Sequence, residues 1–308
     1  MSISELKILV VGRNGQIARD LQKLLPPLGS VSCVGRPEVD LSHPDGIRRV
    51  IQDRRPDVLI NAAAYTAVDQ AESEPEQAMK INAEAPGIMA EEAKRLGALF
   101  ISYSSDYVFD GQKAGPYTED DEPNPLNVYG ASKLAGDRAI QAVDGAHLIF
   151  RTSWVYSMGG KNFFKTIMKL AAERREILVV DDQIGAPTWS RDIAAATVQV
   201  VGQCKVSGSS GGVQHVANGL HGRGGIYNLT AEGKVSWHGF ATAIVDDFGK
   251  QRSDLPTLAR IIPISTSQYP TPARRPPNSR LSNTKIRETF GISLPPWRES
   301  AAKVAKDL

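Results

Sequence analysis

The sequence predicts an α/β protein, with a doubly wound parallel sheet covered by helices on both faces and a second, smaller lobe of mixed α/β structure. Three observations support this fold class. Short apolar runs alternate with longer amphipathic stretches in the first half of the chain, as in βαβ units. A glycine-containing turn directly follows the first apolar run. After Arg151 the alternation becomes looser and mixed.

The apolar runs are expected to be strands because they are short and bounded by polar or turn-forming residues. The segments between them have apolar residues near the 3.6-residue period of an amphipathic helix. The expected strands are 7–11, 32–34, 58–62, 99–103 and 147–151, and the expected helices include 16–25, 76–96 and 128–142.

The second half of the chain is expected to pass between the two lobes. Residues 202–225 are rich in Gly and Ser without periodicity, which predicts a flexible surface excursion. The prolines of 262–277 predict a rigid extended loop. Helices are expected at 162–174, 192–201 and 237–248, and strands at 177–180 and 225–230. The first domain is expected to comprise 1–150 with returns near 172–203 and 226–250, and the smaller lobe 151–171, 204–225 and 251–308.

Composition limits the classes of function. Lys and Arg number 36 against 34 Asp and Glu, so the net charge of +2 gives no reason to expect nucleic acid or an anionic membrane as a partner. Cys33 and Cys204 are far apart and in no metal-type spacing, so neither a metal site nor a disulfide framework is expected. The apolar run near the N-terminus is too short for a signal peptide or a membrane span, and a soluble, cytoplasmic protein is expected.

The first expected strand continues into Gly12-Arg13-Asn14-Gly15-Gln16-Ile17-Ala18, which has the spacing G-x-x-G-x-x-A. Gly12 permits a tight turn, Gly15 lets the backbone approach a pyrophosphate, and Ala18 lets the following helix pack close to the strand. The exposed N–H groups and the dipole at the helix start attract phosphate. The motif therefore predicts a Rossmann-type dinucleotide-binding domain, and the smaller lobe is expected to bind the substrate.

The second expected strand ends at Val34-Gly35-Arg36. An NAD-preferring site usually has an Asp or Glu there to bind the ribose hydroxyls. Arg36 can instead pair with the 2′-phosphate of NADPH, although Glu38 and Asp40 follow closely. NADPH is therefore the expected cofactor, with NADH as the open alternative.

Tyr129 and Lys133 are four residues apart in an expected helix, so they share one face. A free tyrosine, with a pKa of about 10, is a poor acid at neutral pH, and a nearby ammonium lowers that pKa toward the working range. Lys133 can also hydrogen-bond the nicotinamide ribose. Ser105 follows a strand, where parallel sheets bind ligands. Together these residues predict reduction of a carbonyl group: Tyr129 donates the proton and Ser105 polarises the oxygen.

Taken together, these segments resemble the dTDP-4-dehydrorhamnose reductase family of the extended short-chain dehydrogenases. The resemblance covers nearly the whole chain, and its motifs are specific in combination rather than singly. The stretches that carry it are Gly12 to Ala18, Asn61 to Asp69, Ala71 to Pro75, Tyr103 to Gly111, Pro125 to Gly130, Lys133 to Gly136, Arg151 to Tyr156, Asp182 to Thr188, Tyr269 to Ala273 and Asn278 to Leu281.

The resemblance implies roles for individual residues. Ser105, Tyr129 and Lys133 match the family's catalytic positions. A planar arginine in the loop after the proline-rich segment suits a clamp on the substrate's diphosphate. The implied cofactor contacts are Gly15, Gln16 and Ile17 for the pyrophosphate, Asp40 and Leu41 for the adenine side, and Ala64, Tyr65, Thr66 and Tyr103 for the rest of the nucleotide; the implied substrate contacts are Val68, Ser105, Asp106 and Trp154 in the sugar pocket and Asn278, Ser279 and Arg280 in the clamp.

The reaction that the resemblance implies is hydride transfer from NADPH to C4 of dTDP-4-dehydro-β-L-rhamnose, which gives dTDP-L-rhamnose for cell-surface polysaccharides. Ser105 stands where many relatives have threonine, which keeps the hydroxyl. Some relatives dimerise through metal-bound carboxylates, one of them on the helix after the G-x-P-T stretch, but here Thr188 is followed by Trp189-Ser190-Arg191. Because arginine cannot ligate Mg²⁺, no metal is expected, and the chain is expected to be a monomer or a homodimer.

Other functions remain open on the same scaffold. Dehydratases tend to follow the strand-end hydroxyl with Asp-Glu, whereas Ser105 is followed by Asp106 and Tyr107, which argues against elimination. An epimerase would retain tightly bound NAD. A non-catalytic regulatory subunit is a further alternative, because the β subunit of methionine adenosyltransferase resembles this family; the intact Ser105, Tyr129 and Lys133 favour an enzyme.

Overall fold

The computed structural model describes residues 5–205, 216–251 and 258–306. Its main sheet has six strands in the order β10-β5-β4-β3-β1-β2, and every neighbouring pair is parallel. The predicted fold class is therefore confirmed. The strands are β1 (Leu6–Val11), β2 (Gly29–Val34), β3 (Val58–Asn61), β4 (Leu99–Ser105), β5 (His147–Thr152) and β10 (Gly225–Asn228).

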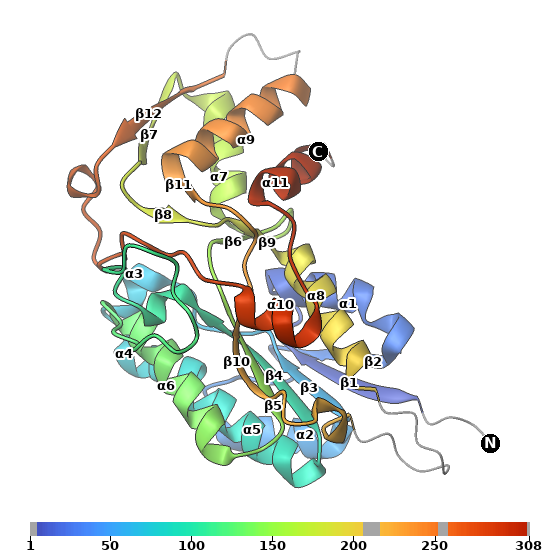
Figure 1. Ribbon diagram of the computed structural model, residues 1–308. Coiled ribbons are helices and arrows are strands. Elements are labelled where there is room, and N and C mark those ends of the chain that lie inside the picture. Colours follow the sequence, from blue (N-terminus) through green and yellow to red (C-terminus); the bar gives the residue numbers. More distant parts are fainter. Residues whose placement is uncertain (1–4, 206–215, 252–257, 307–308) are drawn as a thin grey trace.

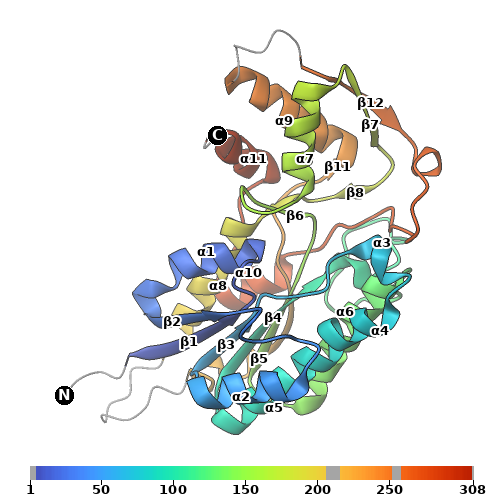
Figure 2. The ribbon, with the colours of Figure 1, turned by 180° about the vertical axis from the view of Figure 1, so that it is seen from behind.

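Helices cover both faces of this sheet (Figures 1 and 2). The side chains of β1 alternate between the faces, so Ile8 and Val10 join one buried cluster while Leu9 and Val11 join another. The first cluster is closed by α1 (Gln16–Leu24), α8 (Ser190–Gln203) and α10 (Thr284–Phe290), and the second by α2 (Pro44–Arg54), α5 (Ala85–Leu96) and α6 (Val128–Val143).

A second lobe lies beyond the carboxyl ends of the sheet strands (Figure 1). It has its own apolar core, in which Tyr156, Phe164 and Phe240 pack ring against ring. Two short strand pairs, β6 (Val155–Tyr156) with β9 (Thr188–Trp189) and β8 (Ile184–Gly185) with β11 (Val235–Ser236), border it. Its larger elements are α7 (Phe163–Glu173), α9 (Trp237–Gln251), α11 (Trp297–Lys306) and the parallel pair β7 (Glu176–Val180) and β12 (Arg260–Ile264).

The two lobes share the chain differently from the expected division. Of the expected returns to the first domain, 190–203 and 225–228 do join the sheet side, but β7 and α9 belong to the core of the second lobe. Conversely, α10 buries Ile286 and Phe290 against the sheet. Each element joins the lobe whose apolar core its buried side chains contact.

Three local expectations also differ. The expected helix 76–96 is divided into α4 (Pro75–Met79), a π-helical turn (Lys80–Glu84) and α5, because Pro86 has no N–H with which to continue the α-helical pattern. The expected loop 262–277 begins as strand β12. Of the expected surface excursion 202–225, residues 206–215 lie outside the described residues, but Val216 and Leu220 are buried in the sheet core.

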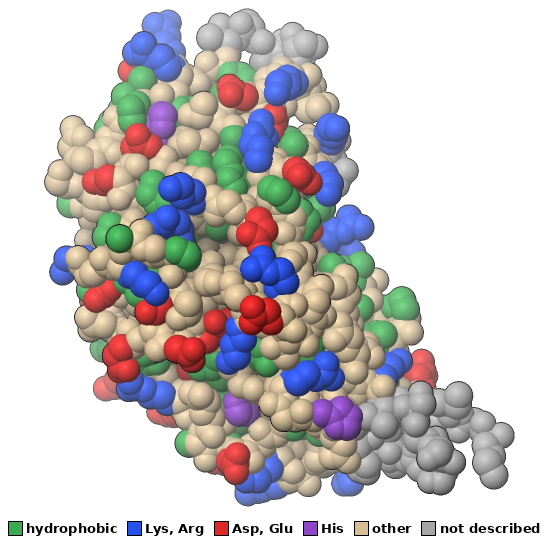
Figure 3. Space-filling model, in the orientation of Figure 1, with side chains coloured by type: hydrophobic (Ala, Val, Ile, Leu, Met, Phe, Trp, Pro, Cys, Tyr) green, Lys and Arg blue, Asp and Glu red, His purple; other side chains and the backbone are tan. Residues whose placement is uncertain are grey.

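The surface carries mixed charge. On the face shown in Figure 3, basic and acidic side chains are interspersed, and no basic stripe forms there. Among the described helices, none combines the length and the apolar character that crossing a bilayer requires.

Candidate active site

A cavity of about 940 Å³ opens at the carboxyl ends of β1, β3 and β4. The sheet contributes residues 11–17, 61–64 and 103–107 to its wall, and the second lobe contributes Trp154 and Trp237. The chain runs from β1 outward to β2 and then returns to β3 on the other side of β1. Open α/β sheets bind ligands where the strand order reverses in this way, so this cavity is the candidate site.

The glycine turn forms the floor of the cavity beside β1. Gly12 has a φ of +113°, and a Cβ there would lie 2.8 Å from the backbone of Ala62, so only glycine fits. Gly15 donates its N–H to the Gly12 carbonyl at 2.8 Å. No side chain of the described residues caps the start of α1, which leaves its first N–H groups free for an anion. These features fit the pyrophosphate of a dinucleotide. Asn14, Gln16 and Ile17 also line the cavity.

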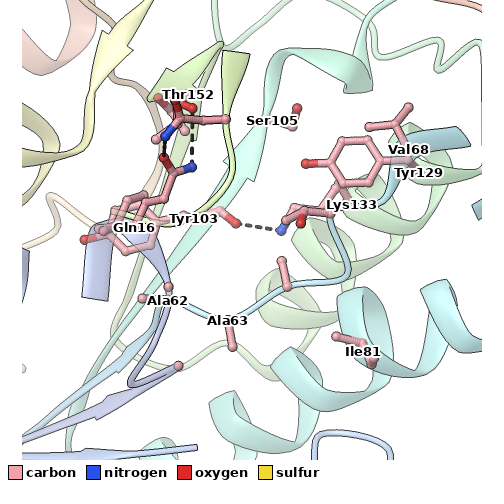
Figure 4. A pocket seen from close by; sticks show the side chains of 18 of the residues that line it. Gln16, Ala62, Ala63, Val68, Ile81, Tyr103, Ser105, Tyr129, Lys133 and Thr152 are labelled. Carbon is pink, nitrogen blue, oxygen red and sulfur yellow. Dashed lines mark hydrogen bonds between the residues drawn. The ribbon is translucent and has the colours of Figure 1, made fainter. Parts of the chain in front are cut away.

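The Gln16 side chain faces the second lobe rather than standing free for phosphate. Its Oε1 accepts hydrogen bonds from Ser157 Oγ and Asn162 Nδ2, both at 2.9 Å. In Figure 4, Gln16 lies on the side of the cavity opposite Tyr129. Gln16 therefore ties the glycine turn to the segment before α7, and its backbone remains the part available to a pyrophosphate.

The far end of the cavity carries two arginines. Arg36, Asp40 and Leu41 all line this end, as the sequence predicts for the adenosine side. Hydrogen bonds from the Ser42 backbone and hydroxyl hold the pKa of Asp40 below its usual range. Among the described residues, no carboxylate forms an ion pair with Arg36, whereas Arg13, which sequence reasoning missed, is paired with Glu38. Arg36 acts on the Asp40 carboxylate only from a distance, so its guanidinium can still pair with a 2′-phosphate.

The segment after β3 lies along the cavity, but one predicted contact points away from it. Ala64 and Thr66 line the wall, and Tyr65 does not. Asn82, on the π-helical turn, accepts from Tyr65 N at 2.8 Å and donates to Tyr65 O at 3.0 Å, and the Tyr65 hydroxyl donates to Glu74 at 2.8 Å. These bonds direct the phenol to a neighbouring helix, which the sequence pattern alone does not reveal.

The three predicted catalytic residues converge on the cavity. Asn127 caps α6 by accepting from Gly130 N at 2.7 Å, and Gly130 lets α6 approach so closely that a Cβ would lie 2.2 Å from Tyr107 O. This contact brings Tyr129 to the end of β4. Figure 4 shows the Ser105 and Tyr129 hydroxyls entering one space, with Lys133 below them. The Ser105 hydroxyl also acts on the pKa of Tyr129, where it opposes the effect of burial.

Burial is the largest cause of the pKa shifts of Tyr129 and Lys133. It raises the pKa of Tyr129 to about 12, against a lowering from the Ser105 hydrogen bond. It lowers the pKa of Lys133 to about 8, while Asp137 opposes this shift. Burial is therefore the main cause of the direction in which the pKa of Tyr129 is shifted.

Lys133 is anchored by the backbone of β4. Its Nζ donates to Tyr103 O at 2.7 Å. The Tyr103 hydroxyl bonds Thr197 at 2.8 Å, and its ring packs in the sheet core. One helical turn from Lys133, Asp137 pairs with Arg151 at 3.1 Å, and both are almost fully buried.

The other end of the cavity is lined by Val68, Asp106 and Trp154, all three predicted for the sugar pocket. Trp154 has a φ of +49°, which is unusual for a residue other than glycine. Its ring stacks on Trp237 with centroids 3.5 Å apart and planes 9° apart. Trp237 is a wall residue that sequence reasoning missed, because it belongs to a helix of the other lobe.

The predicted diphosphate clamp is not part of this wall. Asn278 donates to Lys113 O and Gly115 O at 2.7 and 2.8 Å, and Arg280 bonds Asn278 Oδ1 at 2.8 Å, so these residues hold the segment before Tyr117. Ser279 interacts with Asp106 behind the cavity. Arg275 lines the cavity instead, although its guanidinium is held by Asp69 through two hydrogen bonds of 2.5 and 2.8 Å.

The fold and the site define an NAD(P)H-dependent oxidoreductase of the extended short-chain type. The family model described as "RmlD substrate binding domain" matches residues 6–308. The chain belongs to the dTDP-4-dehydrorhamnose reductase family.

Named relatives cover nearly all of the chain. It is 46% identical to the dTDP-4-dehydrorhamnose reductase of Burkholderia thailandensis over 98% of this chain and 99% of the relative. It is 40% identical to that of Escherichia coli K12, with 98% of both chains covered. A crystal structure of the Bacillus anthracis dTDP-4-dehydrorhamnose reductase in complex with NADP superposes with a TM-score of 0.86, at 31% identity over 99% of this chain and 100% of that chain.

Proposed function

We propose that this protein reduces the C4 keto group of dTDP-4-dehydro-β-L-rhamnose to give dTDP-L-rhamnose, with NADPH as the cofactor. The observation that carries the proposal is the convergence of Ser105, Tyr129 and Lys133 on a cavity that begins at an uncapped glycine turn. Relatives at 40–46% identity are named as reductases of this substrate, which supports the choice of sugar.

Each residue of the group has a distinct role in this reaction. Tyr129 gives its phenolic proton to the carbonyl oxygen, and the Ser105 hydroxyl stabilises the charge that develops there. Lys133, held by Tyr103 O, is positioned to orient the cofactor's ribose and to favour the phenolate left on Tyr129. When bound, NADPH supplies the hydride. Gly12 and Gly15 leave room for its pyrophosphate, and Arg36 offers a cation to its 2′-phosphate.

The nucleotide sugar is held, in this proposal, by Val68, Asp106 and the stacked Trp154 near the catalytic group. Arg275 is a better candidate for contact with the substrate than Arg280, because it lines the cavity. We also propose a reducing, cytoplasmic location, supported by two unpaired cysteines, and a monomer or homodimer as the working state.

The direct test is oxidation of NADPH by the purified protein with dTDP-4-dehydrorhamnose generated in situ. Tyr129→Phe removes the proton donor and is expected to lower kcat on the order of 10²- to 10⁴-fold. Tyr117→Phe is the matched control, because it removes the hydroxyl of another buried tyrosine that does not line the cavity. Turnover by Tyr129→Phe equal to that of the wild type would refute the assignment.

The alternative functions give different results in the same preparation. An epimerase retains tightly bound NAD after purification, whereas the reductase is expected to exchange its dinucleotide with solution. A regulatory subunit is expected to consume no NADPH and to co-purify with a larger synthetase. A regulatory subunit does not explain why all three groups of the proton-donating site are present, whereas an epimerase is distinguished by its bound NAD.

A further inference from the structure

Asp106 is a buried carboxyl in the cavity wall whose state the reduction itself does not explain. It directly follows β4, and its side chain is 3% exposed. Its Oδ1 is 3.1 Å from Ser105 Oγ, whereas its Oδ2 is buried without a hydrogen-bond partner among the described residues. An ionised carboxylate in such a place is costly. The geometry therefore favours a carboxylic acid that carries its own proton.

We propose that Asp106 is the proton reservoir of the active site, and that it restores the Tyr129 proton through the Ser105 hydroxyl. This inference rests on the proposed reductase function. Ser105 lies between the two groups, because its hydroxyl donates to Asp106 Oδ1 at 3.1 Å and faces the space that the Tyr129 hydroxyl enters (Figure 4). The backbone N–H of Tyr107 also donates to Ser105 Oγ at 3.2 Å, which fixes the hydroxyl between them.

The surroundings of Asp106 support a neutral acid near neutral pH. Burial raises its pKa to about 7, against the hydrogen bonds of Ser279 and Ser105. The titratable groups that face it are the phenols of Tyr107, on its own turn, and Tyr129, on α6. Within the described chain, no cation contributes to the shift; Arg275 acts on Tyr107 instead. Asp106 therefore exchanges its proton within the range in which the enzyme is expected to work.

The proposed relay moves two protons after the reduction and leaves one negative charge on Asp106. The Tyr129 O–H bond breaks as the product O–H bond forms, and the hydride of the proposed reaction completes the reduction. The Ser105 proton moves to the Tyr129 oxygen while the Asp106 proton moves to the Ser105 oxygen. Tyr129 and Ser105 end unchanged, Asp106 ends as a carboxylate, and it takes a proton from water when the product leaves the cavity.

The test compares Asp106→Asn with the wild type across pH 6–9. The wild-type kcat is expected to fall as Asp106 ionises, with an apparent pKa of about 7. In Asp106→Asn, kcat is expected to be lower by about 10²-fold and to lose this pH-dependent step, with KM changed much less. Asp110→Asn, which alters an acid outside the cavity wall, is expected to keep the wild-type profile. If Asp106 only binds the sugar, Asp106→Asn will raise KM and will keep the pH-dependent step in kcat. That result would overturn the proposal that Asp106 is a proton reservoir.

A second readout needs neither cofactor nor turnover. Infrared difference spectra of the free protein between pH 6 and pH 9 are expected to contain a protonated-carboxyl band that Asp106→Asn lacks and Asp110→Asn keeps. Absence of that band from the wild-type spectrum would refute the proposal that Asp106 is a proton reservoir. Absence of reductase activity in the wild type would overturn the proposed function. If the wild type is active but Asp106→Asn has the same dependence of kcat on pH, only the role of Asp106 as a proton reservoir is overturned.

Discussion

Breaking the buried pair of Asp137 and Arg151 is expected to cost more stability than any surface charge change. The Arg151 Nε and Asp137 Oδ2 atoms are 3.1 Å apart, and the side chains are 2% and 3% exposed. At an effective dielectric constant of about 20, their attraction is about 5 kcal/mol. Asp137→Asn leaves the guanidinium buried without its counter-ion, and a loss of about 3–5 kcal/mol in the free energy of unfolding is expected.

The assay is urea unfolding at pH 7 of Asp137→Asn, Arg151→Met and the double variant. The double variant buries no charge at these positions, so it is expected to be at least as stable as either single variant. The control is Glu173→Gln on α7, which breaks an exposed pair with Lys169 at 3.9 Å and is expected to change stability by no more than about 0.5 kcal/mol. Single-variant losses as small as the control's, or losses that simply add, would refute the reasoning.

Three further outcomes follow from the site. Gly12→Ala places a Cβ 2.8 Å from the Ala62 backbone, so it is expected to abolish the rise in Tm that NADPH causes in the wild type; a preserved rise would contradict the close approach. Arg36→Ala is expected to weaken NADPH binding by about 10-fold or more with little effect on NADH, measured by nicotinamide fluorescence; equal losses would contradict a 2′-phosphate contact. Asp106 keeps its proton to about pH 7 in the fold but to only about pH 4 in the unfolded chain, so wild-type stability falls as pH rises between these values. Asp106→Asn is therefore expected to be more stable than the wild type at pH 8, by up to about 4 kcal/mol, and similar near pH 4; a constant difference in thermal unfolding would contradict this sign.

Short sequence motifs predicted those parts of the site that depend on neighbouring residues in the chain. The glycine turn, the Tyr129–Lys133 spacing and the hydroxyl after β4 each follow from a few adjacent residues, and the structure brings them to one cavity. Helix α2 was expected only as a segment between two strands, without bounds, because just Ile47 and Ile51 are buried along it and its apolar periodicity is weak.

The directions of the other side chains depend on hydrogen-bond partners that the motifs do not include. Tyr65 turns outward because Glu74 and Asn82 hold it, and Arg280 lies outside the cavity because Asn278 and the segment near Ala114 bind it. Arg275 reaches the wall through a pairing with Asp69, about 200 residues earlier in the chain. Side-chain direction in these cases follows from tertiary contacts, which motifs do not encode.

The last two helices complete two different cores. Helix α10 places Ile286 and Phe290 under the sheet, and α11 places Ala301 and Val304 under α9. Neither hydrophobic core is whole until these residues have left the ribosome. A chain that stops before residue 284 is therefore expected to leave both lobes with apolar surface open to water and to chaperones.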